Sequence, residues 1–526
     1  MITPLLLLLA TAATPAADVA VVCPPDFTAE LAPWIEHRKQ QGHRISFVDG
    51  RGTAEEIAAR IKQLAKRASL THVVLVGDVP PVQGRLSKVT VASFVNTVPT
   101  FHVSAEVNVR WGSEPEIASD QPYSDLDGDQ LPDIAVGRIP ADSRADLRNL
   151  VRKIIAYETS NDYGPWRRRV NFIAGLGGFG AIADAALETA AKKLITDGVP
   201  ASYSTSMTQA SWRSPYCPDP RDFRGAVLGR LNEGCLFWVY IGHGHRRQVD
   251  WVHVPGGAFP IFEQQDAAQL HCQSGSPIAC FLACYAGAYD HAEDCLAEDM
   301  LSAPGGPVAV YAGSRVTMPY AMAVMGLGML ESCFGETPPA TLGETVTLTK
   351  RRMMATEDLP ANRKALDGIA ALISPAPADL AAERREHLYL FNLLGDPLLR
   401  MPQPHRIQLV VPNVIKPGES ITIEGTSDVT GNATIELIVR RDRLTFKAPL
   451  RPKFEPTSSF LSGFNEIYAK ANNPQFVATQ LQVTDSKKFT CSLNAPADAS
   501  GPCHIRAFIE GEEACAVGHC DLDVGP

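Results

Sequence analysis

The chain of 526 residues is predicted to be an α/β protein, with two α/β subdomains built on parallel sheet and a β-sandwich after them. Two observations predict this fold class. Over the first 400 residues, short apolar runs alternate with amphipathic helical stretches, which is typical of parallel strands joined by covering helices. From His405 onward, short alternating strands separated by turn residues replace this pattern, and no long helix is predicted.

The first α/β block shows the alternation most clearly. Its predicted strands are residues 19–23, 44–48, 73–76 and 134–136. The helices predicted between or after them are residues 27–41, 54–67 and 142–158. Residues 80–120 show no clear hydrophobic period, so no helix or strand is predicted there.

The second α/β block repeats the pattern. Its predicted strands are residues 170–174, 236–241, 278–282 and 308–311. The helices predicted between or after them are residues 181–196, 221–233, 320–333 and roughly 341–355. Two arrangements remain open, one long sheet or two sheets side by side.

The C-terminal segment has the strand pattern and the size, about 120 residues, of an immunoglobulin-like β-sandwich. Its predicted strands are residues 407–411, 420–424, 433–439, 478–483 and 503–510. The chain is therefore predicted to have four parts. These are a signal peptide (1–17), an N-terminal α/β subdomain (18–145), a second α/β subdomain (146–403) and the sandwich (404–526).

The first 17 residues predict the compartment. An unbroken apolar run at residues 5–9 is followed by small residues and a cleavage point expected between Ala12 and Asp18, which is typical of a secretory signal peptide. No Lys or Arg precedes the run, so an apolar N-terminus without signal function is the alternative. Because no later stretch approaches the roughly 20 apolar residues of a spanning helix, we expect a soluble protein that is secreted, periplasmic or at the cell surface.

The charge balance argues against one class of partner. With 48 Lys and Arg against 58 Asp and Glu, the formal net charge is −10. Nucleic acids and anionic membranes both favour clustered positive charge on the protein. Neither is therefore expected to bind this chain.

Four of the twelve cysteines crowd the C-terminal end of the chain. They are Cys491, Cys503, Cys515 and Cys520. An exported chain can pair such cysteines in disulfides, although their connectivity does not follow from the sequence. If Cys284 must stay a free thiol, an odd number remains, so at least one more cysteine is unpaired or pairs with another chain.

A histidine and a cysteine follow two consecutive predicted strands. The strand 236–241 runs into His243, which has glycine on both sides, and the strand 278–282 is followed by Cys284. If the strands are parallel neighbours, the two side chains meet at the same edge of the sheet. A thiolate that attacks an amide carbon, beside an imidazole that protonates the leaving amine, is the chemistry of acyl transfer. The N–H groups of Gly244 and Cys284 are the expected oxyanion donors.

Each half of this pair also has a structural interpretation. A histidine beside glycine in a tight turn is commonly structural, and a cysteine at the end of an apolar strand commonly acts as a small buried hydrophobe. A zinc site that includes His243, His245 and His253 is a further alternative, although no third ligand has a recognisable zinc spacing.

An acidic loop precedes the fourth predicted strand. Residues 124–133 read SDLDGDQLPD, with aspartates at alternate positions around a glycine. Calcium prefers several oxygen ligands at about 2.3–2.6 Å, and a tight loop with this spacing supplies them. The bidentate glutamate of an EF-hand is missing, so an acidic turn with Asx hydrogen bonds is the alternative. The predicted calcium ligands are Asp125, Asp127, Asp129 and Asp133.

Six stretches, in order along the chain, match the pattern of one peptidase family. They are residues 75–78 (LVGD), 134–138 (IAVGR), 242–244 (GHG) with Trp251 following, 283–287 (ACYAG), 295–298 (CLAE) and 392–397 (NLLGDP). By them the chain resembles the gingipain-like cysteine peptidases of family C25, whose fold is caspase-like. The resemblance spans roughly residues 19–400 and implies that residues 146–403 are the catalytic subdomain.

By this resemblance, His243 and Cys284 form a catalytic dyad. Cys284 is preferred to Cys280 for two reasons. Glycine stands three residues after Cys284, and only Cys284 lies at the right distance before the stretch 295–298. Cys280 is expected inside the strand.

The resemblance also implies a substrate-pocket wall made by Arg315, Thr317 and Met318. At that wall, Arg315 would either favour an acidic substrate residue or face solvent. Two family carboxylates do not carry over. Leu176 stands where gingipains have the group that orients the histidine, and Leu187 where they have the group that selects a basic residue, although Asp184 and Glu188 are near. The P1 specificity therefore does not follow from the sequence.

Together these observations predict a secreted cysteine endopeptidase that hydrolyses peptide bonds through a thioester acyl-enzyme. Polypeptide is the expected substrate, no cofactor is expected for catalysis, and calcium is expected only in a structural role. Two alternatives share the fold. One is a sortase-like transpeptidase that passes the same thioester to an amine, and the other is a catalytically inactive surface or adhesion protein.

Overall fold

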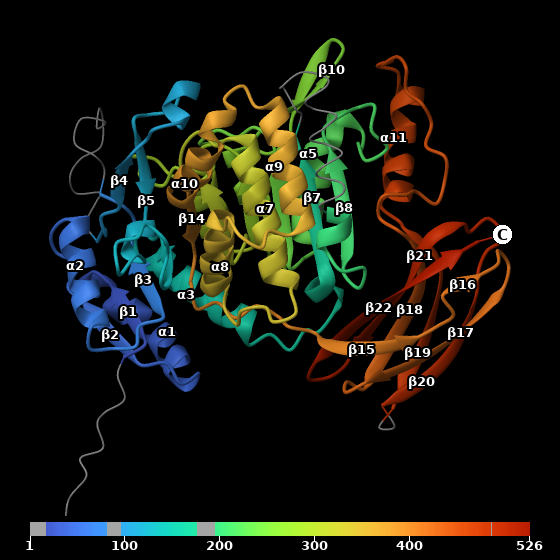
Figure 1. Ribbon diagram of the computed structural model, residues 1–526, viewed down its shortest axis with the longest axis horizontal. Coiled ribbons are helices and arrows are strands. Elements are labelled where there is room, and N and C mark those ends of the chain that lie inside the picture. Colours follow the sequence, from blue (N-terminus) through green and yellow to red (C-terminus); the bar gives the residue numbers. More distant parts are fainter. Residues whose placement is uncertain (1–16, 81–95, 176–194, 485–486, 526) are drawn as a thin grey trace, which may run out of the picture.

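One ten-stranded sheet forms the centre of the computed structural model, which describes residues 17–80, 96–175, 195–484 and 487–525 (Figure 1). The strand order is β2-β1-β3-β6-β14-β13-β12-β9-β7-β8. The bounds are β1 (Val19–Val22), β2 (Ile45–Val48), β3 (His72–Val76), β6 (Ala135–Ile139), β7 (Arg169–Ala174), β8 (Ser204–Gln209), β9 (Phe237–Ile241), β12 (Ile278–Leu282), β13 (Ala309–Gly313) and β14 (Phe391–Leu394). Of the two arrangements that the sequence left open, the protein has the single long sheet.

Two parallel blocks that run in opposite directions make up this sheet. β14 is parallel to β6, with Leu394 opposite Arg138, but antiparallel to β13, with Leu394 opposite Val310. Every other neighbouring pair of strands in the sheet is parallel. The carboxyl ends of β12, β9 and β7 therefore lie along one edge. The sheet is continuous across the predicted division between residues 145 and 146.

Helices cover both faces of the sheet, and β1 shows why. Its successive side chains point to opposite faces. Val21 packs in the core that includes Leu31 of α1, whereas Val22 packs in the core that includes Ile57 of α2. A strand that is buried on both faces is apolar throughout, which is the pattern of a helix-covered parallel sheet.

The predicted helices within the described residues are all present, with ends that differ by one or two residues. The helices of the α/β core are α1 (Thr28–Gln40), α2 (Ala54–Ala65), α3 (Arg144–Glu158), α5 (Phe223–Asn232), α6 (Leu296–Ser302), α7 (Pro319–Phe334), α8 (Leu342–Met354), α9 (Ala361–Ile373) and α10 (Leu380–Leu390). The sequence analysis missed α6, α9 and α10.

Two short antiparallel hairpins extend from this core. One is β4 (Phe101–Ser104) with β5 (Glu116–Ser119), in the region where no element was predicted. The other is β10 (Trp251–Val254) with β11 (Gly257–Pro260), which follows the histidine loop and projects at the top of Figure 1. Strands of four residues carry too few alternating positions to give a hydrophobic period.

The C-terminal strands form a separate eight-stranded sheet, confirming that this part is built on β-strands. Its strands are β15 (His405–Val410), β16 (Val414–Ile415), β17 (Ser420–Ser427), β18 (Gly431–Val439), β19 (Gln475–Val483), β20 (Lys488–Asn494), β21 (Gly501–Glu510) and β22 (Cys515–Val524). The order is β19-β18-β21-β22-β15-β17-β20, with β16 paired to β22. Because the end strands β19 and β20 contact each other, the sheet nearly closes.

One helix corrects the prediction that this domain lacks a long helix. In Figure 1, α11 (Ser458–Ala471) stands beside β8, away from the C-terminal sheet. Its buried Leu461 and Phe464 belong to the core of the α/β block. The Tyr468 hydroxyl lies 2.8 Å from Thr208 Oγ1 in β8. The helix buries its apolar face against another domain, so its own sequence did not indicate where that face would pack.

Buried charged side chains dock the C-terminal domain on the α/β core. Glu436 of β18 accepts hydrogen bonds from Arg506 of β21 at 2.9 and 3.0 Å and lies 3.3 Å from Arg168 of the core. All three side chains are buried. Removing one member of a buried pair leaves an uncompensated charge, which is strongly destabilising. The domain is therefore fixed to the core by specific contacts.

The disulfides that the sequence allowed are absent. All twelve cysteines lie within the described residues, and none is paired. The strand register explains this in the C-terminal domain, because Cys503 lies opposite Leu522 and Cys515 lies opposite Glu510 across β21 and β22. Neither of these two cysteines has another cysteine opposite it.

Candidate active site

The strands that precede the predicted dyad are neighbours in the sheet. β9 and β12 are parallel, with Ile241 opposite Leu282 at their carboxyl ends. The Gly242 N–H donates to the Leu282 oxygen at 3.2 Å, which continues the pairing beyond the strands. His243 and Cys284 therefore follow adjacent strand ends at one edge of the sheet.

The histidine loop and the cysteine turn touch at Gly244. A Cβ atom at this position would lie 2.5 Å from the Cys284 oxygen and 2.9 Å from the Ala283 Cβ, so any side chain would collide with the turn. Within the described part of the chain, neither the Gly244 N–H nor the Cys284 N–H donates a hydrogen bond. Both groups are thus available for the predicted oxyanion role.

The turn that carries Cys284 contains a left-handed residue. Tyr285, the next residue, has φ of 57°. Its N–H donates to the Arg315 oxygen at 3.1 Å, and the Gly287 N–H donates to the Gly313 oxygen at 3.0 Å. A non-glycine residue in this conformation costs on the order of 1 kcal/mol and persists only where its surroundings hold it. The turn is therefore held by its neighbours and not by its own preference.

The Cys284 sulfur lies against Thr317. The Thr317 N–H donates to Sγ at 3.3 Å, and the hydroxyl oxygen lies 3.5 Å from Sγ. Cys280, in contrast, lies inside β12 and is 5% exposed, and burial raises its pKa to about 12. A thiol held in its protonated form is a poor nucleophile. Position and burial both favour Cys284.

A buried hydroxyl fixes the backbone beside the predicted histidine. Tyr240 of β9 donates to the His243 oxygen at 2.8 Å and accepts from the Asp250 N–H at 3.2 Å. Burial raises the pKa of Tyr240, so the hydroxyl stays protonated. The sequence analysis missed this contact because a buried aromatic residue in a strand gives no signal of a polar role.

A sequence model of peptidase family C25 matches residues 12–402, which is most of the chain. The chain belongs to peptidase family C25. The resemblance drawn from the six stretches is thereby confirmed, and the protein is a cysteine peptidase, a hydrolase that acts on polypeptides.

Solved structures share the fold of this C25 peptidase. The Arg-specific cysteine proteinase gingipain R (RgpB) has 17% identity and a TM-score of 0.53, over 98% of this chain and 100% of that one. A complex of the pro- and mature domains of RgpB from Porphyromonas gingivalis has 17% identity and a TM-score of 0.52, over 97% of this chain and 100% of that one. At this identity the likeness shows the fold alone. No curated protein matches the chain.

Arg315 of this C25 peptidase does not face solvent, which corrects one of the two roles considered for it. Its guanidinium donates to both Asp290 carboxylate oxygens at 2.8 and 2.6 Å, and its Nε donates to the Glu116 oxygen at 2.9 Å. The residue is 0% exposed. The role of Arg315 toward an acidic substrate residue stays a prediction. Pocket roles for Thr317, beside the Cys284 sulfur, and for the buried Met318 stay predictions.

Several sequence predictions fall outside the described residues. They are the signal peptide apart from residue 17, most of the helix predicted at 181–196, and the positions Leu176, Asp184, Leu187 and Glu188.

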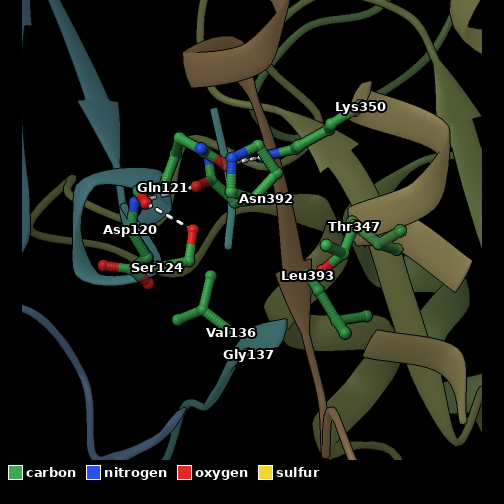
Figure 2. A pocket seen from close by; sticks show the side chains of 11 residues that line it. Asp120, Gln121, Ser124, Val136, Gly137, Thr347, Lys350, Asn392 and Leu393 are labelled. Atoms are coloured by element: carbon green, nitrogen blue, oxygen red, sulfur yellow. Dashed lines mark hydrogen bonds between the residues drawn. The ribbon is translucent and has the colours of Figure 1, made fainter. Parts of the chain in front are cut away.

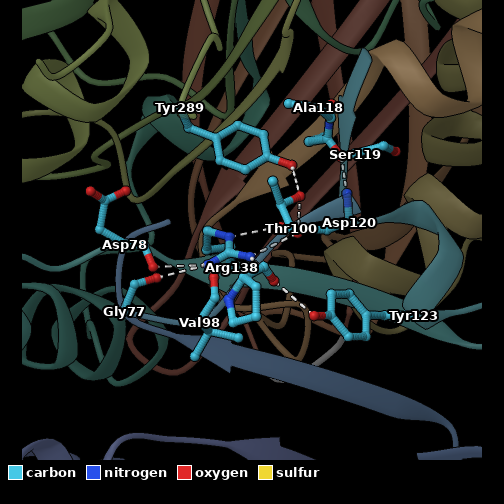
Figure 3. Close-up of polar contacts among 12 residues, drawn as sticks. Gly77, Asp78, Val98, Thr100, Ala118, Ser119, Asp120, Tyr123, Arg138 and Tyr289 are labelled. Carbon is cyan, nitrogen blue, oxygen red and sulfur yellow. Dashed lines mark hydrogen bonds and ion pairs between the residues drawn. The ribbon is translucent and has the colours of Figure 1, made fainter. Parts of the chain in front are cut away.

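Arg138, in the stretch 134–138, forms a buried ion pair with Asp120, and the stretch 75–78 contributes a backbone acceptor to it. Arg138 donates to both Asp120 carboxylate oxygens at 2.8 Å and to a backbone oxygen at the end of β3 at 3.0 Å (Figure 3). The Thr100 hydroxyl donates to Asp120 and lies 2.9 Å from the hydroxyl of Tyr289, in the loop after Cys284. Thr100 therefore links the buried ion pair to the loop that follows Cys284.

The stretch 392–397 supplies a second buried ion pair. Asp396 is fully buried, and Arg38 Nη2 donates to it at 2.6 Å. Trp34 Nε1 donates to the same carboxylate. Because Arg38 and Trp34 belong to α1, this pair joins the end of β14 to a helix of the N-terminal block.

The stretch 295–298 begins α6. The Glu298 carboxylate accepts a hydrogen bond from the Cys295 N–H at 2.9 Å, which caps the first turn. Of the six stretches, only 242–244 and 283–287 contain the predicted dyad. The other four belong to the structural core, where they form ion pairs, backbone contacts and a helix cap.

Asp78 belongs to a group of carboxylates near the beginning of α6. Burial, and then the neighbouring Asp142, raise the pKa of Asp78 to about 7, and the same two causes raise the pKa of Asp294 to about 7. Figure 3 shows the Asp78 side chain directed away from Arg138. Since its folded pKa lies above the ordinary value, Asp78 is protonated in the folded state below pH 7. The contribution of protonated Asp78 to the stability of the folded protein is present at low pH and is lost as the pH rises through about 7.

Replacing Asp78 with asparagine is expected to raise the midpoint of thermal unfolding at about pH 8.5 and to change it little at about pH 4, close to the ordinary pKa of the group. The amide resembles the protonated acid, so the loss of stability with rising pH should shrink. Thermal unfolding between these pH values measures the effect. Asp428→Asn, an acid with 83% side-chain exposure, is the control and should leave the slope unchanged. Equal slopes for Asp78→Asn and the wild type would contradict the prediction.

The acidic loop brings three of the four predicted calcium ligands together. One carboxylate oxygen from each of Asp125, Asp127 and Asp133 lies within 4.8 Å of the others. Asp129 is outside this group, and its Oδ1 accepts a hydrogen bond from the Leu131 N–H at 2.7 Å. Bonds of that kind are the Asx turns of the alternative interpretation, so the loop shows both features.

The zinc alternative gains no support. Among the residues that the structure describes, the acidic loop is the one group of three or more His, Cys, Asp or Glu side chains close enough to share an ion. His243, His245 and His253 do not form such a group.

Two cavities lie away from the dyad. The smaller, about 10 Å³, is lined by Gln121, Asn392 and Lys350 among others (Figure 2). Lys350 Nζ donates to Gln121 Oε1 at 3.0 Å, and burial lowers the pKa of this lysine to about 7. A space of this size holds about one water molecule. The larger, about 540 Å³, lies among α7, α8 and α9. Neither His243 nor Cys284 lines either cavity.

Proposed function

We propose that the protein is a secreted cysteine endopeptidase in which Cys284 is the nucleophile and His243 the general acid and base. The observation that carries the proposal is the position of the two residues directly after adjacent parallel strands, with Gly244 in contact with the Cys284 turn. Membership of family C25 supports the class of reaction.

The reaction follows from these groups. The Cys284 thiolate attacks the carbonyl carbon of the scissile bond, and the oxyanion accepts hydrogen bonds from the N–H groups of Gly244 and Cys284. His243 protonates the leaving amine, which leaves a thioester on the sulfur. Water, deprotonated by His243, then attacks the thioester and releases the new carboxyl end.

Cys284→Ala is expected to abolish labelling by a thiol-directed peptidyl probe, because the probe must be attacked by the nucleophile. Cys280→Ala is the matched control, since Cys280 is buried in the strand that precedes Cys284, and it should label like the wild type. Undiminished labelling of Cys284→Ala would sink the assignment. A protein that labels at no residue and cleaves nothing in a diverse peptide library would be the inactive surface or adhesion protein instead.

The same acyl-enzyme could pass to an amine, which would make the protein a sortase-like transpeptidase. Product analysis by mass spectrometry, with an amine nucleophile added to the peptide library, separates the two reactions. Hydrolysed ends as the main product support the endopeptidase, and amine adducts in excess support the transpeptidase.

Export and an accessory role for the C-terminal domain complete the proposal. Export rests on the apolar run at residues 5–9. No helix among the described residues is long and apolar enough to cross a membrane. We assign residues 404–526 as an immunoglobulin-like accessory domain, on the basis of its strand-rich sequence and its docking on the core. Glu436 pairs with Arg168 of the core, and Arg441 Nη2 donates to the Pro200 oxygen at 2.7 Å.

A structural calcium ion in the acidic loop is also proposed, with Asp125, Asp127 and Asp133 as ligands and Asp129 as a fourth acidic group. Three converging carboxylates suit a hard cation. Calcium is expected to raise the midpoint of thermal unfolding and EGTA to lower it. Asp127→Asn should remove this response, and Asp129→Asn, which lies outside the close group, should keep most of it. The same midpoint with calcium and with EGTA would contradict the site.

A further inference from the structure

The carboxylate of Glu114 joins the two loops that carry the dyad. Glu114 precedes β5, yet its Oε2 accepts a hydrogen bond from the Tyr285 hydroxyl at 2.7 Å and its Oε1 accepts one from Arg246 Nη2 at 2.8 Å. Tyr285 follows Cys284, and Arg246 belongs to the loop of His243. One side chain from a third segment therefore contacts both loops.

On the cysteine side, the contact holds a strained residue. Tyr285 is the left-handed residue of the turn, with φ of 57°. Its backbone N–H is held by the Arg315 oxygen and its hydroxyl by Glu114. Burial, and then the hydrogen bond to Glu114, raise the pKa of Tyr285 to about 12, so the hydroxyl remains a donor. A hydrogen bond to an ionised carboxylate is stronger than one between neutral groups.

On the histidine side, Arg246 is held at several points. Its guanidinium lies 5.6 Å from the centroid of the Tyr285 ring, and its backbone oxygen accepts from the Leu296 N–H at 2.6 Å. Arg315 Nε lies 3.8 Å from Glu114. Although burial acts to raise it, the pKa of Glu114 is lowered by the Tyr285 hydroxyl, by a backbone hydrogen bond and by the two arginines. The network is thus an anion held between two cations and a phenol.

We propose that Glu114 is a positioning residue for the dyad, which holds the Cys284 turn through Tyr285 and the His243 loop through Arg246. The inference rests on the proposed function, because the distance between the loops matters to a rate only if Cys284 and His243 react together. A misplacement of about 1 Å between reacting groups can lower a rate about 100-fold. The Glu114 side chain is 24% exposed, so its loss removes the link without opening a cavity in the core.

Glu114→Ala is expected to lower kcat for a fluorogenic peptide by about 10- to 100-fold while KM changes little, because the link acts on the reacting groups and not on substrate binding. Glu114→Gln keeps an acceptor for Tyr285 but loses the charge, so its kcat should lie between that of the wild type and that of Glu114→Ala. Tyr285→Phe should lower kcat in the same direction. The double variant Glu114→Ala/Tyr285→Phe should be no slower than Glu114→Ala, because both changes remove the same hydrogen bond between Tyr285 and Glu114.

Glu30→Gln is the matched control, because it also removes the charge of a glutamate that pairs with an arginine. Glu30 of α1 pairs with Arg148 of α3 at 3.3 Å, and neither residue belongs to the two loops. It should keep the wild-type kcat and KM. Wild-type kcat in Glu114→Ala, or fully additive effects in the double variant, would overturn the proposal. If Glu114→Ala does not fold, kcat of Glu114→Gln and of Tyr285→Phe is compared with that of the wild type. A lower kcat in both variants supports the proposal, and wild-type kcat in both overturns it.

A wild-type protein that neither cleaves peptides nor reacts with the peptidyl probe would refute the proposed function, not this link. The rate at which iodoacetamide alkylates Cys284, read on its peptide by mass spectrometry, needs no turnover and still tests the link. Glu114→Ala should change this rate by at least about threefold, because the turn that presents the sulfur is no longer held. Equal rates in the two folded proteins would overturn the proposal.

Discussion

Replacing His243 with alanine is expected to lower kcat/KM for peptide hydrolysis at neutral pH by about 10³-fold. In the proposed mechanism the imidazole accepts the proton of the Cys284 thiol and protonates the leaving amine, so its loss removes both proton transfers. His245 and His253 lie further along the same loop and the hairpin that follows it, and the proposed mechanism gives neither a role. Steady-state kinetics on a substrate found in the peptide library measures the loss.

Controls for this prediction are His245→Ala and His253→Ala, which should keep wild-type kinetics. The double variant His243→Ala/Cys284→Ala should be no slower than Cys284→Ala, because residues that act as one unit are not additive. A His243→Ala protein with wild-type activity would remove His243 from the mechanism. Equal losses in all three histidine variants, with inhibition by a zinc chelator, would favour the zinc site.

Replacing Arg138 with methionine is expected to lower the free energy of unfolding by about 3–5 kcal/mol. The guanidinium is 0% exposed and neutralises Asp120, which is also buried. Methionine fills much of the space but leaves the Asp120 carboxylate without its cation. Denaturant unfolding of the two proteins, followed by fluorescence, gives the difference.

A second substitution tests this cause. Arg138→Met/Asp120→Asn should be less destabilised than Arg138→Met alone, because the uncompensated charge is gone. Arg51→Met is the control, since Arg51 pairs with Asp49 at 2.7 Å but its side chain is 91% exposed. It should leave the unfolding curve unchanged. A single Arg138→Met variant as stable as the wild type would contradict the prediction.

The sequence predicted the elements whose signal is local. β12 (Ile278–Leu282) matches its prediction at both ends because it is a continuous apolar run that begins directly after Pro277. β14 was missed because it follows α10 directly, without a turn between helix and strand. α11 was missed because Leu461 and Phe464 are buried by another domain.

The candidate site also contains residues that the sequence predicted and residues that it did not. The two strand-end residues His243 and Cys284 were found because each follows its strand within the same short segment. Arg315 was misplaced because its partner Asp290 is 25 residues away, and nothing near Arg315 in sequence indicates burial. Glu114 escaped notice because it lies 171 residues from Tyr285.

The sequence by itself determined the α/β class followed by a β-rich end, the strand ends that carry His243 and Cys284, and the family. Hydrophobic period and short ordered stretches are local properties, and a chain displays them before it folds. The tertiary structure alone decided the single sheet with its antiparallel seam, the unpaired cysteines, the burial of Arg315 and the link through Glu114. Each of these depends on which distant segments meet, and that is set by packing of the whole chain and not by any one segment.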